Sequence, residues 1–329
     1  MIVSILVPIY GVEKYIERCA RCLFGQTYED INYIFVDDCT LDGSMDVLEH
    51  VLADYPERKE RVRIIRHDHN RGLSAARNTA VACCKTDWII HVDSDDWIEP
   101  NTVELLVNEQ MKTGADIVSG KALRHTLNGE FELVVSNQDD KTQFVLENLG
   151  YDLHHTLWNR LIRKSLYDEG IVCAEEGTNL GEDWQVMSRL AWNARKVAHL
   201  DTVTYHYNCT NTSSYVYGKN QFNRKYFEQD YRSWEIVNDF YKDKAEVFRD
   251  KLFESGEILL YRYLYLAVEG KDKQAFLKIK DRLLRHSPFF FSQGKAGQSV
   301  LKSYVERHYL LLCASLPVRR LLVWLRKNN

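Results

Sequence analysis

The chain has 329 residues, of which 45% are hydrophobic and 27% charged, the balance of a globular protein with one large domain or two. Its net charge of −4 conceals an asymmetry: residues 1–218 hold 21 Lys and Arg against 34 Asp and Glu, whereas residues 219–329 hold 22 against 13. No basic cluster with interleaved aromatic residues occurs in the acidic part, so we expect no nucleic-acid partner. The asymmetry predicts a domain over 1–218 and a basic C-terminal region over 219–329.

The eight cysteines are scattered along the chain, and only Cys19 and Cys22 have a spacing that suits a metal or a redox pair. They fall inside a helical pattern, which favours simple packing. No basic, apolar leader precedes the first predicted strand. We therefore predict a reducing, cytoplasmic compartment.

Short apolar runs alternate with helical patterns over about the first 120 residues. The predicted strands cover 2–7, 31–36, 62–65, 88–92 and 115–119. The predicted helices cover 12–23, 44–54 and 73–84, and a further one begins after Pro100. This alternation predicts an α/β fold with a doubly wound, mostly parallel sheet and right-handed crossovers.

The pattern is less regular after Lys121. Residues 127–130 are typical of a hairpin turn, 181–193 of a helix and its start, and 197–207 of a strand near a sheet edge. We assign the acceptor-binding part to about 121–218. Several helical segments are expected from Lys219 to the end of the chain.

Polar residues follow each of the first four predicted strands: Tyr10, then Asp37 and Asp38, then Asn70-Arg71-Gly72, then Asp93–Asp96. Asp, Asn and Gly favour turns in any protein, so each group alone has a purely local explanation. All four groups nevertheless fall at the carboxyl ends of strands, where ligands bind in open α/β sheets. Their convergence predicts a binding site at that edge.

Asp93, Asp95 and Asp96 stand within four residues of one another. Carboxylates this close repel one another, and the cluster needs a compensating cation. Carboxylate oxygens suit a hard divalent ion, so we predict Mn²⁺ or Mg²⁺ as the cofactor.

The phosphates of a nucleotide have no other obvious binding loop in this sequence. Neither a Gly-x-Gly-x-x-Gly after the first strand nor a Gly-x-x-x-x-Gly-Lys loop is present. We therefore expect the metal at the Asp cluster to hold the phosphates. Tyr10 is suited to stack on a base and Asp38 to accept a hydrogen bond from a ring N–H, as uracil offers.

Glu182 and Asp183 follow Gly181 at the start of a predicted helix, whose dipole favours their ionised forms. They are candidates for the general base that would activate an attacking hydroxyl. Helix capping is the alternative explanation, because Asp and Glu commonly occupy helix starts.

Four motifs in order resemble those of family 2 inverting glycosyltransferases with the GT-A fold, and the resemblance covers roughly residues 1–215. The motifs are Val7–Tyr10, Phe35–Ser44, Asn70–Asn78 and Val92–Asp96. The resemblance implies a nucleotide-sugar donor, a divalent metal and inversion at the anomeric carbon. One departure is Leu41, where the family commonly has a small polar residue, and we expect it to leave donor binding intact.

The resemblance also implies roles for single residues. Asp38 would recognise the base, Asp93 would lie near the ribose and take part in binding the metal, and Asp95 would bind the metal. Asp183 would be the catalytic base, with Glu182 as the second candidate. The remaining predicted donor-binding residues are Pro8, Tyr10, Glu13, Asn70, Gly72, Arg77 and Ser94.

Two further residues have a functional and a structural explanation. His206, within Tyr205–Tyr207, is a candidate metal ligand, although a histidine beside tyrosines is often simply packed. Trp158 is a candidate for stacking on the acceptor sugar, although a large aromatic residue there is often part of the core.

The end of the chain has an amphipathic pattern over 318–327. Val318, Leu321, Leu322 and Leu325 share one helical face, and Arg319, Arg320, Arg326 and Lys327 share the other. Such a helix is typical of peripheral membrane contact, here at the inner face of the cell membrane. Packing on the catalytic domain or in a homodimer is the alternative.

These observations predict a metal-dependent inverting glycosyltransferase that moves a sugar, most simply from a UDP-sugar, to a glycan or polyprenyl-linked acceptor in surface polysaccharide synthesis. A non-catalytic nucleotide- or glycan-binding relative is one alternative, although such a protein has no need to retain repelling carboxylates. A sugar nucleotidyltransferase is another, although the turn after the first strand has no basic residue before Lys14.

Overall fold

The computed structural model describes residues 1–286 except 134, 137, 152–154 and 212–222. The strands are β1 Val3–Ile9, β2 Ile31–Asp37, β3 Val62–Arg66, β4 Trp88–His91, β5 Trp97–Ile98, β6 Ile117–Thr126, β7 Gly129–Leu133, β8 Arg160–Arg163 and β9 Val197–Asn208. The helices before the C-terminal region are α1 Ile16–Phe24, α2 Ser44–Ala53, a short 3₁₀ helix Pro56–Arg61, α3 Leu73–Cys83, α4 Thr102–Thr113, α5 Lys141–Leu149, α6 Ser165–Asp168 and α7 Glu182–Asn193. The C-terminal region contains α8 Arg224–Tyr241, α9 Glu246–Glu269 and α10 Lys273–His286.

The described strands form one nine-stranded sheet in the order β3-β2-β1-β4-β8-β6-β9-β5, with β7 paired to β6 as a hairpin. The first four strands of this order are all parallel, as predicted. β8 then pairs antiparallel with both β4 and β6, and β9 is parallel to β6. The mixed α/β fold and the mostly parallel sheet are therefore confirmed.

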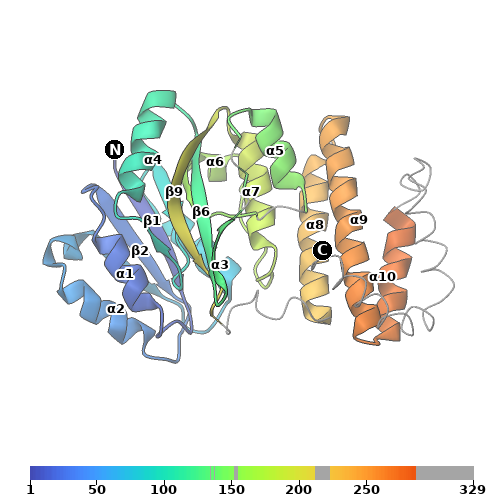
Figure 1. Ribbon diagram of the computed structural model, residues 1–329, viewed down its shortest axis with the longest axis horizontal. Coiled ribbons are helices and arrows are strands. Elements are labelled where there is room, and N and C mark those ends of the chain that lie inside the picture. Colours follow the sequence, from blue (N-terminus) through green and yellow to red (C-terminus); the bar gives the residue numbers. More distant parts are fainter. Residues whose placement is uncertain (134, 137, 152–154, 212–222, 287–329) are drawn as a thin grey trace.

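The sheet is covered on both faces, which explains why its central strands are apolar throughout. Residues of β1 alternate between two hydrophobic clusters, with Val3, Ile5, Val7 and Ile9 in one and Leu6 in the other. Helices α1, α2 and α4 contribute to the first cluster, and α3, α6 and α7 to the second. Figure 1 shows these layers around the sheet.

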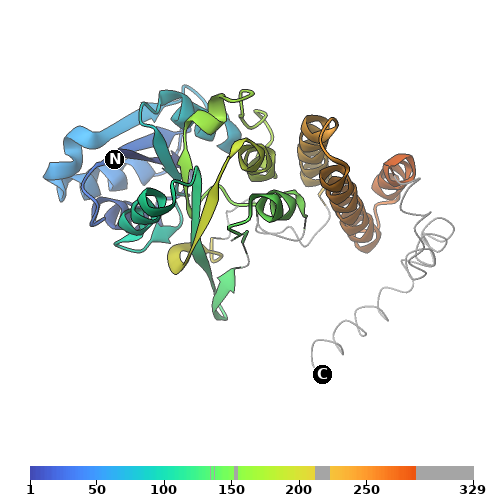
Figure 2. The same ribbon diagram turned by 90° about the horizontal axis from the view of Figure 1, so that it is seen from above.

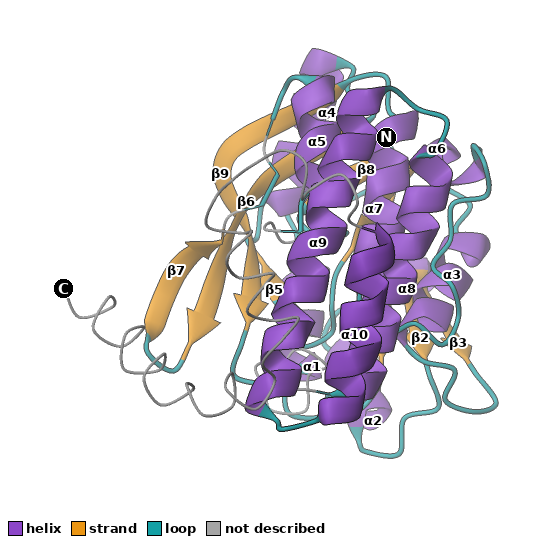
Figure 3. Cartoon of the chain, turned by 90° about the vertical axis from the view of Figure 1, so that its right-hand side faces the viewer, coloured by secondary structure: helices purple, strands orange, loops and turns teal. Residues whose placement is uncertain are grey.

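The C-terminal helices pack beside the sheet domain and share its second core cluster. Trp184 of α7 and Phe144 of α5 belong to the same cluster as Trp234 of α8 and Leu260 of α9. Figures 1 and 2 show α8, α9 and α10 together at one side of the sheet, and Figure 3 shows α9 and α10 next to each other. The predicted boundary near residue 218 therefore separates two regions that complete one core.

Two strands of the sheet, β8 and the two-residue β5, were not predicted, because each is too short to show a periodic pattern. β9 lies near the sheet edge, as predicted, with only β5 paired outside it. The hairpin at 127–130 and the helix beginning at Glu182 are confirmed.

None of the helices described in the structure is long and apolar enough to cross a membrane. The predicted amphipathic segment 318–327 lies outside the described residues.

Candidate active site

The loop after β4 is anchored to β9 through Asp96. The Asp96 side chain is fully buried, and its carboxylate accepts hydrogen bonds from the Tyr205 hydroxyl at 2.7 Å and the Asn208 backbone N–H at 2.7 Å. Burial and the carboxylates of Asp95 and Asp93 raise the pKa of Asp96 well above its usual range. Asp96 thus has a structural role, which leaves Asp93 and Asp95 to face a ligand.

Asp95 carries the clearest sign of an uncompensated negative charge. Burial and the neighbouring Asp93 carboxylate raise the pKa of Asp95 to about 6. Asn211 Nδ2 donates a hydrogen bond to Asp95 Oδ2 at 2.8 Å, but it brings no positive charge. A divalent cation would relieve this repulsion.

The carboxylate oxygens of this loop suit a hard cation that also takes ligands from a bound substrate and from water. Among the described residues, no group of three or more His, Cys, Asp and Glu side chains is arranged to hold a metal. The chain therefore offers the Asp93 and Asp95 carboxylates, and phosphate oxygens and water would complete the shell. Mg²⁺ and Mn²⁺ sites at nucleotides are commonly built in this way.

Arg77 of α3 joins the two predicted halves of the site. Its side chain is 4% exposed, and Nη2 contacts Asp93 Oδ1 at 2.7 Å. Nη1 contacts Glu182 Oε1 at 2.6 Å and Asp183 Oδ1 at 2.5 Å. Burial lowers the pKa of Arg77, but the three carboxylates raise it by more. The pKa of Arg77 therefore lies well above its usual value.

Residues separated by about 90 positions are therefore brought to one guanidinium. Sequence reasoning placed Arg77 at the donor and Asp183 at the base, but no pattern indicated that one side chain would contact both groups. The predicted donor loop and the predicted base are therefore joined by one side chain in this structure.

Glu182 and Asp183 begin α7 after Gly181, which occupies the N-cap position. Both carboxylates turn toward Arg77, and the Asp183 side chain is 20% exposed against 8% for Glu182. Asp183 is therefore the more accessible of the two acids.

The predicted base-binding end lies beyond β1 and β2. Tyr10 is 49% exposed and follows β1 directly. Asp38 is 3% exposed, and its carboxylate accepts the backbone N–H groups of Arg71 at 2.8 Å and Gly72 at 2.7 Å and contacts His67 Nδ1 at 2.7 Å. Asp38 therefore shapes the turn before α3, and these three contacts occupy most of the about four acceptor positions on its carboxylate.

Four other predicted donor residues have different surroundings. Pro8 is buried within β1, Ser94 is 5% exposed, and Asn70 is exposed in the turn before α3. Glu13 Oε2 accepts the Gly43 N–H at 3.0 Å and so supports the start of α2.

The two weaker predictions fall on packed side chains. Both ring nitrogens of His206 are engaged, with His125 at 2.9 Å and Glu99 at 2.7 Å, and its ring stacks on Trp97. A metal would have to displace one of these partners. Trp158 is 4% exposed and stacks on Tyr205, so the structure places it in the core and presents none of its faces to an acceptor sugar.

Sequence reasoning missed several residues that support the Asp loop. Asn208 and Asn211 bind it from 113 and 116 positions away. Arg18 of α1 donates to the Asp95 carbonyl at 3.3 Å and lies 3.5 Å above the Trp97 ring. No local signal marks such contacts, because only the tertiary fold brings these segments together.

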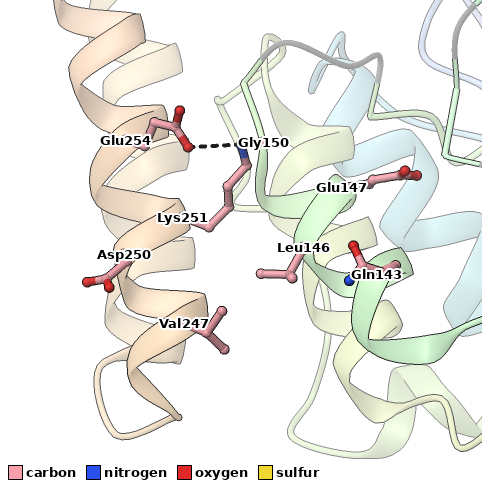
Figure 4. Close-up of a pocket in the computed structure, with 8 residues that line it drawn as sticks. All are labelled: Gln143, Leu146, Glu147, Gly150, Val247, Asp250, Lys251 and Glu254. Carbon is pink, nitrogen blue, oxygen red and sulfur yellow. Dashed lines mark hydrogen bonds and ion pairs between the residues drawn. The ribbon is translucent and has the colours of Figure 1, made fainter. Parts of the chain in front are cut away.

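A shallow pocket of about 470 Å³ lies elsewhere, between α5 and α9 (Figure 4). Its lining includes Leu146, Val247 and Lys251, with Lys251 paired to Glu254 at 3.0 Å. None of the predicted site residues lines it, so it does not compete with the Asp loop as the catalytic site.

A mostly parallel sheet with acidic loops at its carboxyl edge and a second acidic pair tied to them by one arginine agrees with the GT-A type of enzyme that the sequence motifs predict. Residues 4–170 match the model of glycosyl transferase family 2. This chain belongs to that family and is a glycosyltransferase. The match ends before Gly181, so the predicted base lies outside it.

Two curated proteins illustrate the relationship. EpsH of Bacillus subtilis (strain 168), named as a glycosyltransferase, is 29% identical over 262 residues, which cover 76% of this chain and 72% of EpsH. Chondroitin synthase of Escherichia coli is 39% identical over 111 residues, which cover 34% of this chain but only 16% of that protein.

A solved structure has the same fold over nearly the whole chain. It is residues 1–349 of Staphylococcus aureus TarS in complex with UDP-GlcNAc, with a TM-score of 0.71 and 17% identity. The superposition covers 96% of this chain and 91% of that structure.

Proposed function

We propose that this protein is a metal-dependent inverting glycosyltransferase that transfers a sugar from a UDP-sugar to a hydroxyl of a glycan or polyprenyl-linked glycan acceptor in surface polysaccharide synthesis. One observation carries the proposal: Arg77 contacts both Asp93 of the strand-end loop and Asp183 at the start of α7. The group that would bind the leaving diphosphate and the group that would activate the acceptor are thereby held side by side. The UDP-GlcNAc in TarS and the polysaccharide named in chondroitin synthase support the donor and acceptor classes.

The donor is proposed to lie along the carboxyl edge of the sheet. Its base would stack on Tyr10 and donate a ring N–H to Asp38, and its ribose would approach Asp93. The Asp93 and Asp95 carboxylates would hold Mn²⁺ or Mg²⁺, which supplies charge neutralisation for the departing diphosphate.

Transfer is proposed to proceed in one displacement. Asp183 accepts the proton of the acceptor hydroxyl, and that oxygen forms a bond to the anomeric carbon. The bond from this carbon to the diphosphate oxygen breaks on the opposite face, and its electron pair leaves with the nucleoside diphosphate. Attack opposite the leaving group inverts the anomeric configuration.

Asp183 is preferred over Glu182 as the base because of its access to a substrate. Both acids contact Arg77, but the Asp183 side chain is the more exposed. Glu182 then serves to share the charge of Arg77.

Two substitutions test this division of roles. Asp95→Ala is expected to abolish Mn²⁺-dependent binding of the UDP-sugar, measured by calorimetry. Asp183→Asn is expected to retain that binding and to lose transfer, measured as UDP release in the presence of acceptor. Equal loss of donor affinity in the two variants would refute the assignment.

The same assay separates the alternative functions. Mn²⁺-dependent release of UDP from a UDP-sugar supports a glycosyltransferase. A sugar nucleotidyltransferase would instead release pyrophosphate from a nucleoside triphosphate, and a non-catalytic relative would bind the donor without turnover. Thermal-shift measurements with UDP-, GDP- and dTDP-sugars identify the base.

We propose a peripheral position at the inner face of the cell membrane through residues 318–327, with the catalytic domain in the cytoplasm. The pattern of basic and apolar residues in that segment supports the proposal. Deletion of residues 316–329 is expected to weaken binding to vesicles that contain anionic lipid. Unchanged vesicle binding would exclude the contact, and a change in oligomeric state would favour a homodimer role instead.

A further inference from the structure

The loop 173–181, which leads into α7, is held on two sides. On one side it contacts the start of α3, where the Ser74 hydroxyl donates to the Thr178 carbonyl and Asn78 bonds to Ala174 through both its amide atoms. On the other side it contacts α8 of the C-terminal region. The position of this loop sets where the first turn of α7 lies.

The contacts from α8 are polar and close. Arg232 pairs with Glu175 at 2.7 Å, and Gln229 Nε2 donates to the Gly177 carbonyl at 3.0 Å. The Ser233 hydroxyl is fully buried and lies 3.3 Å from the Leu180 carbonyl and 3.0 Å from the Gln229 carbonyl. Helix α8 therefore contacts the loop at several places along its length.

Gln185 connects these contacts to the turn that carries the candidate base. It is fully buried two residues after Asp183, and its Oε1 accepts the Glu175 N–H at 2.8 Å. Its Nε2 donates to Ser233 Oγ at 3.0 Å. One side chain thus joins the first turn of α7 both to the start of the loop and to α8.

The backbone angle and the close neighbours of Gly181 leave no room for a side chain at this position. Gly181 has a φ of +82°, and a Cβ built on it would lie 2.7 Å from Ser233 Oγ and 3.2 Å from Asp230 Oδ1. Asp230 is itself held by the Tyr263 hydroxyl at 2.6 Å. Helix α8 is therefore packed directly against the turn that directs α7.

We propose that Ser233 is a positioning residue for glycosyl transfer, which acts through Gln185 to hold the first turn of α7 in the orientation that directs Asp183 toward the acceptor. The proposal rests on the assignment of Asp183 as the base. It gives the C-terminal region, which lies outside the matched family segment, an indirect part in catalysis through the position of α7.

Loss of the Ser233 hydroxyl is expected to affect turnover more than donor binding, because the predicted donor and base groups stand on different elements. Asp93 is held by the Tyr205 hydroxyl and by Arg77, and Asp95 by Asn208 and Asn211, whereas Ser233 contacts neither acid. A small shift of a catalytic group can reduce the rate strongly while ground-state binding is retained. Loss of the Ser233 hydroxyl should therefore change turnover and leave donor affinity intact.

The test uses the full chain with Ser233→Ala. We expect kcat for transfer to fall about 10-fold or more, because a displaced base loses its near-attack geometry. The affinity for UDP with Mn²⁺, measured by calorimetry, should stay within about 2-fold, because the donor groups do not move. Gln185→Met should have a similar effect, and the double variant should lose no more than the worse single one, because both changes break one link.

Ser255→Ala provides a matched control. Ser255 of α9 is also a fully buried serine, and its hydroxyl bonds to the Leu149 carbonyl at 2.7 Å and the Lys251 carbonyl at 2.8 Å. It contacts neither the loop 173–181 nor α7 through this hydroxyl. We expect a similar loss of thermal stability in this variant with kcat unchanged.

Hydrogen exchange gives a readout that does not depend on the identity of the base. In Ser233→Ala, amides of 175–185 should exchange faster, and in Ser255→Ala they should not. Faster exchange there with unchanged kcat would overturn the positioning role, as would an equal loss of kcat in the two serine variants. Retained transfer by Asp183→Asn would instead overturn the assignment of the base.

Discussion

Asp95 is a predicted metal ligand, and its charge lowers the free energy of unfolding of the metal-free protein at neutral pH. Its carboxylate stands beside Asp93, and burial and that neighbour raise its pKa to about 6. A folded-state pKa above the unfolded value means that the folded chain retains a proton which the unfolded chain has lost. Stability then falls as pH rises from about 4 to about 6, and the penalty persists above that range.

Asp95→Asn is therefore expected to stabilise the metal-free protein at pH 7 by about 2–3 kcal/mol, from the size of the pKa shift. The gain should shrink as pH falls toward 4 and vanish only below the unfolded pKa of about 3.8, where the Asp95 carboxyl is protonated in both states of the wild type. Urea unfolding of the two proteins between pH 4 and pH 8 measures it. A pH-independent difference would contradict the electrostatic explanation.

Arg77 is a buried cation shared by three acids, Asp93, Glu182 and Asp183. Arg77→Met is expected to lower the free energy of unfolding at pH 7 by about 3–5 kcal/mol, the usual cost of breaking a buried ion pair on one side. Arg77→Lys keeps the charge and should lose less, although an ammonium cannot reproduce the forked contacts to Asp93 and Asp183.

Urea unfolding at pH 7 and at pH 5 tests this prediction. The deficit of Arg77→Met should be smaller at pH 5, because carboxylates that have lost the neighbouring guanidinium take up protons more readily there. If the methionine variant were as stable as the wild type at pH 7, the ion-pair cluster would have no structural importance.

At the scale of elements, the turn before α3 links the predicted base-binding residue Asp38 to the loop before α7. Gly72 has a φ of +89°, and a Cβ on it would lie 2.5 Å from the Asn179 amide. Its N–H donates to Asp38. Only glycine tolerates both the backbone angle and this close approach.

Gly72→Ala is expected to destabilise the protein by about 1–3 kcal/mol through backbone strain and to reduce UDP affinity by displacing the turn from Asp38. Gly114→Ala is the matched control, because Gly114 also has a positive φ, +69°, but a Cβ there meets nothing within 4 Å. It should cost about 1 kcal/mol with UDP affinity unchanged. Equal UDP affinity in the Gly72 variant and the wild type would show that the turn does not shape the base site.

At the scale of the molecule, the sheet domain and the C-terminal helices are parts of one core. Trp184, Phe144, Trp234 and Leu260 share a hydrophobic cluster, so removing α8–α10 would expose apolar faces of α5 and α7. Residues on both sides of the predicted division near residue 218 therefore belong to one hydrophobic cluster.

A chain that ends at residue 218 is therefore expected to lose cooperative thermal unfolding and to bind a hydrophobic dye, because it exposes this cluster. A chain that ends at residue 286 retains α8–α10 and should unfold as cooperatively as the full chain. Differential scanning calorimetry compares the two. A sharp transition in the shorter chain would show that residues 1–218 fold alone.

The α/β class, the order of the first four strands along the chain and the residues at their carboxyl ends could all be predicted from the amino-acid sequence. These features follow from local periodicity and turn chemistry, which short stretches such as Ile31–Asp37 carry in full. The Asp93–Asp95 cluster was also predicted, because repulsion between neighbouring carboxylates is a property of adjacent residues.

The contacts between residues far apart in the chain could be seen only in the tertiary structure. It placed Arg77 between Asp93 and Asp183, buried Trp158 against Tyr205, engaged both nitrogens of His206, and packed Ser233 against the turn before Asp183. Such contacts join elements far apart in the chain, and they depend on strand order and helix packing. No local pattern encodes them, because each of these residues is equally compatible with a surface or a core position until the fold supplies its neighbours.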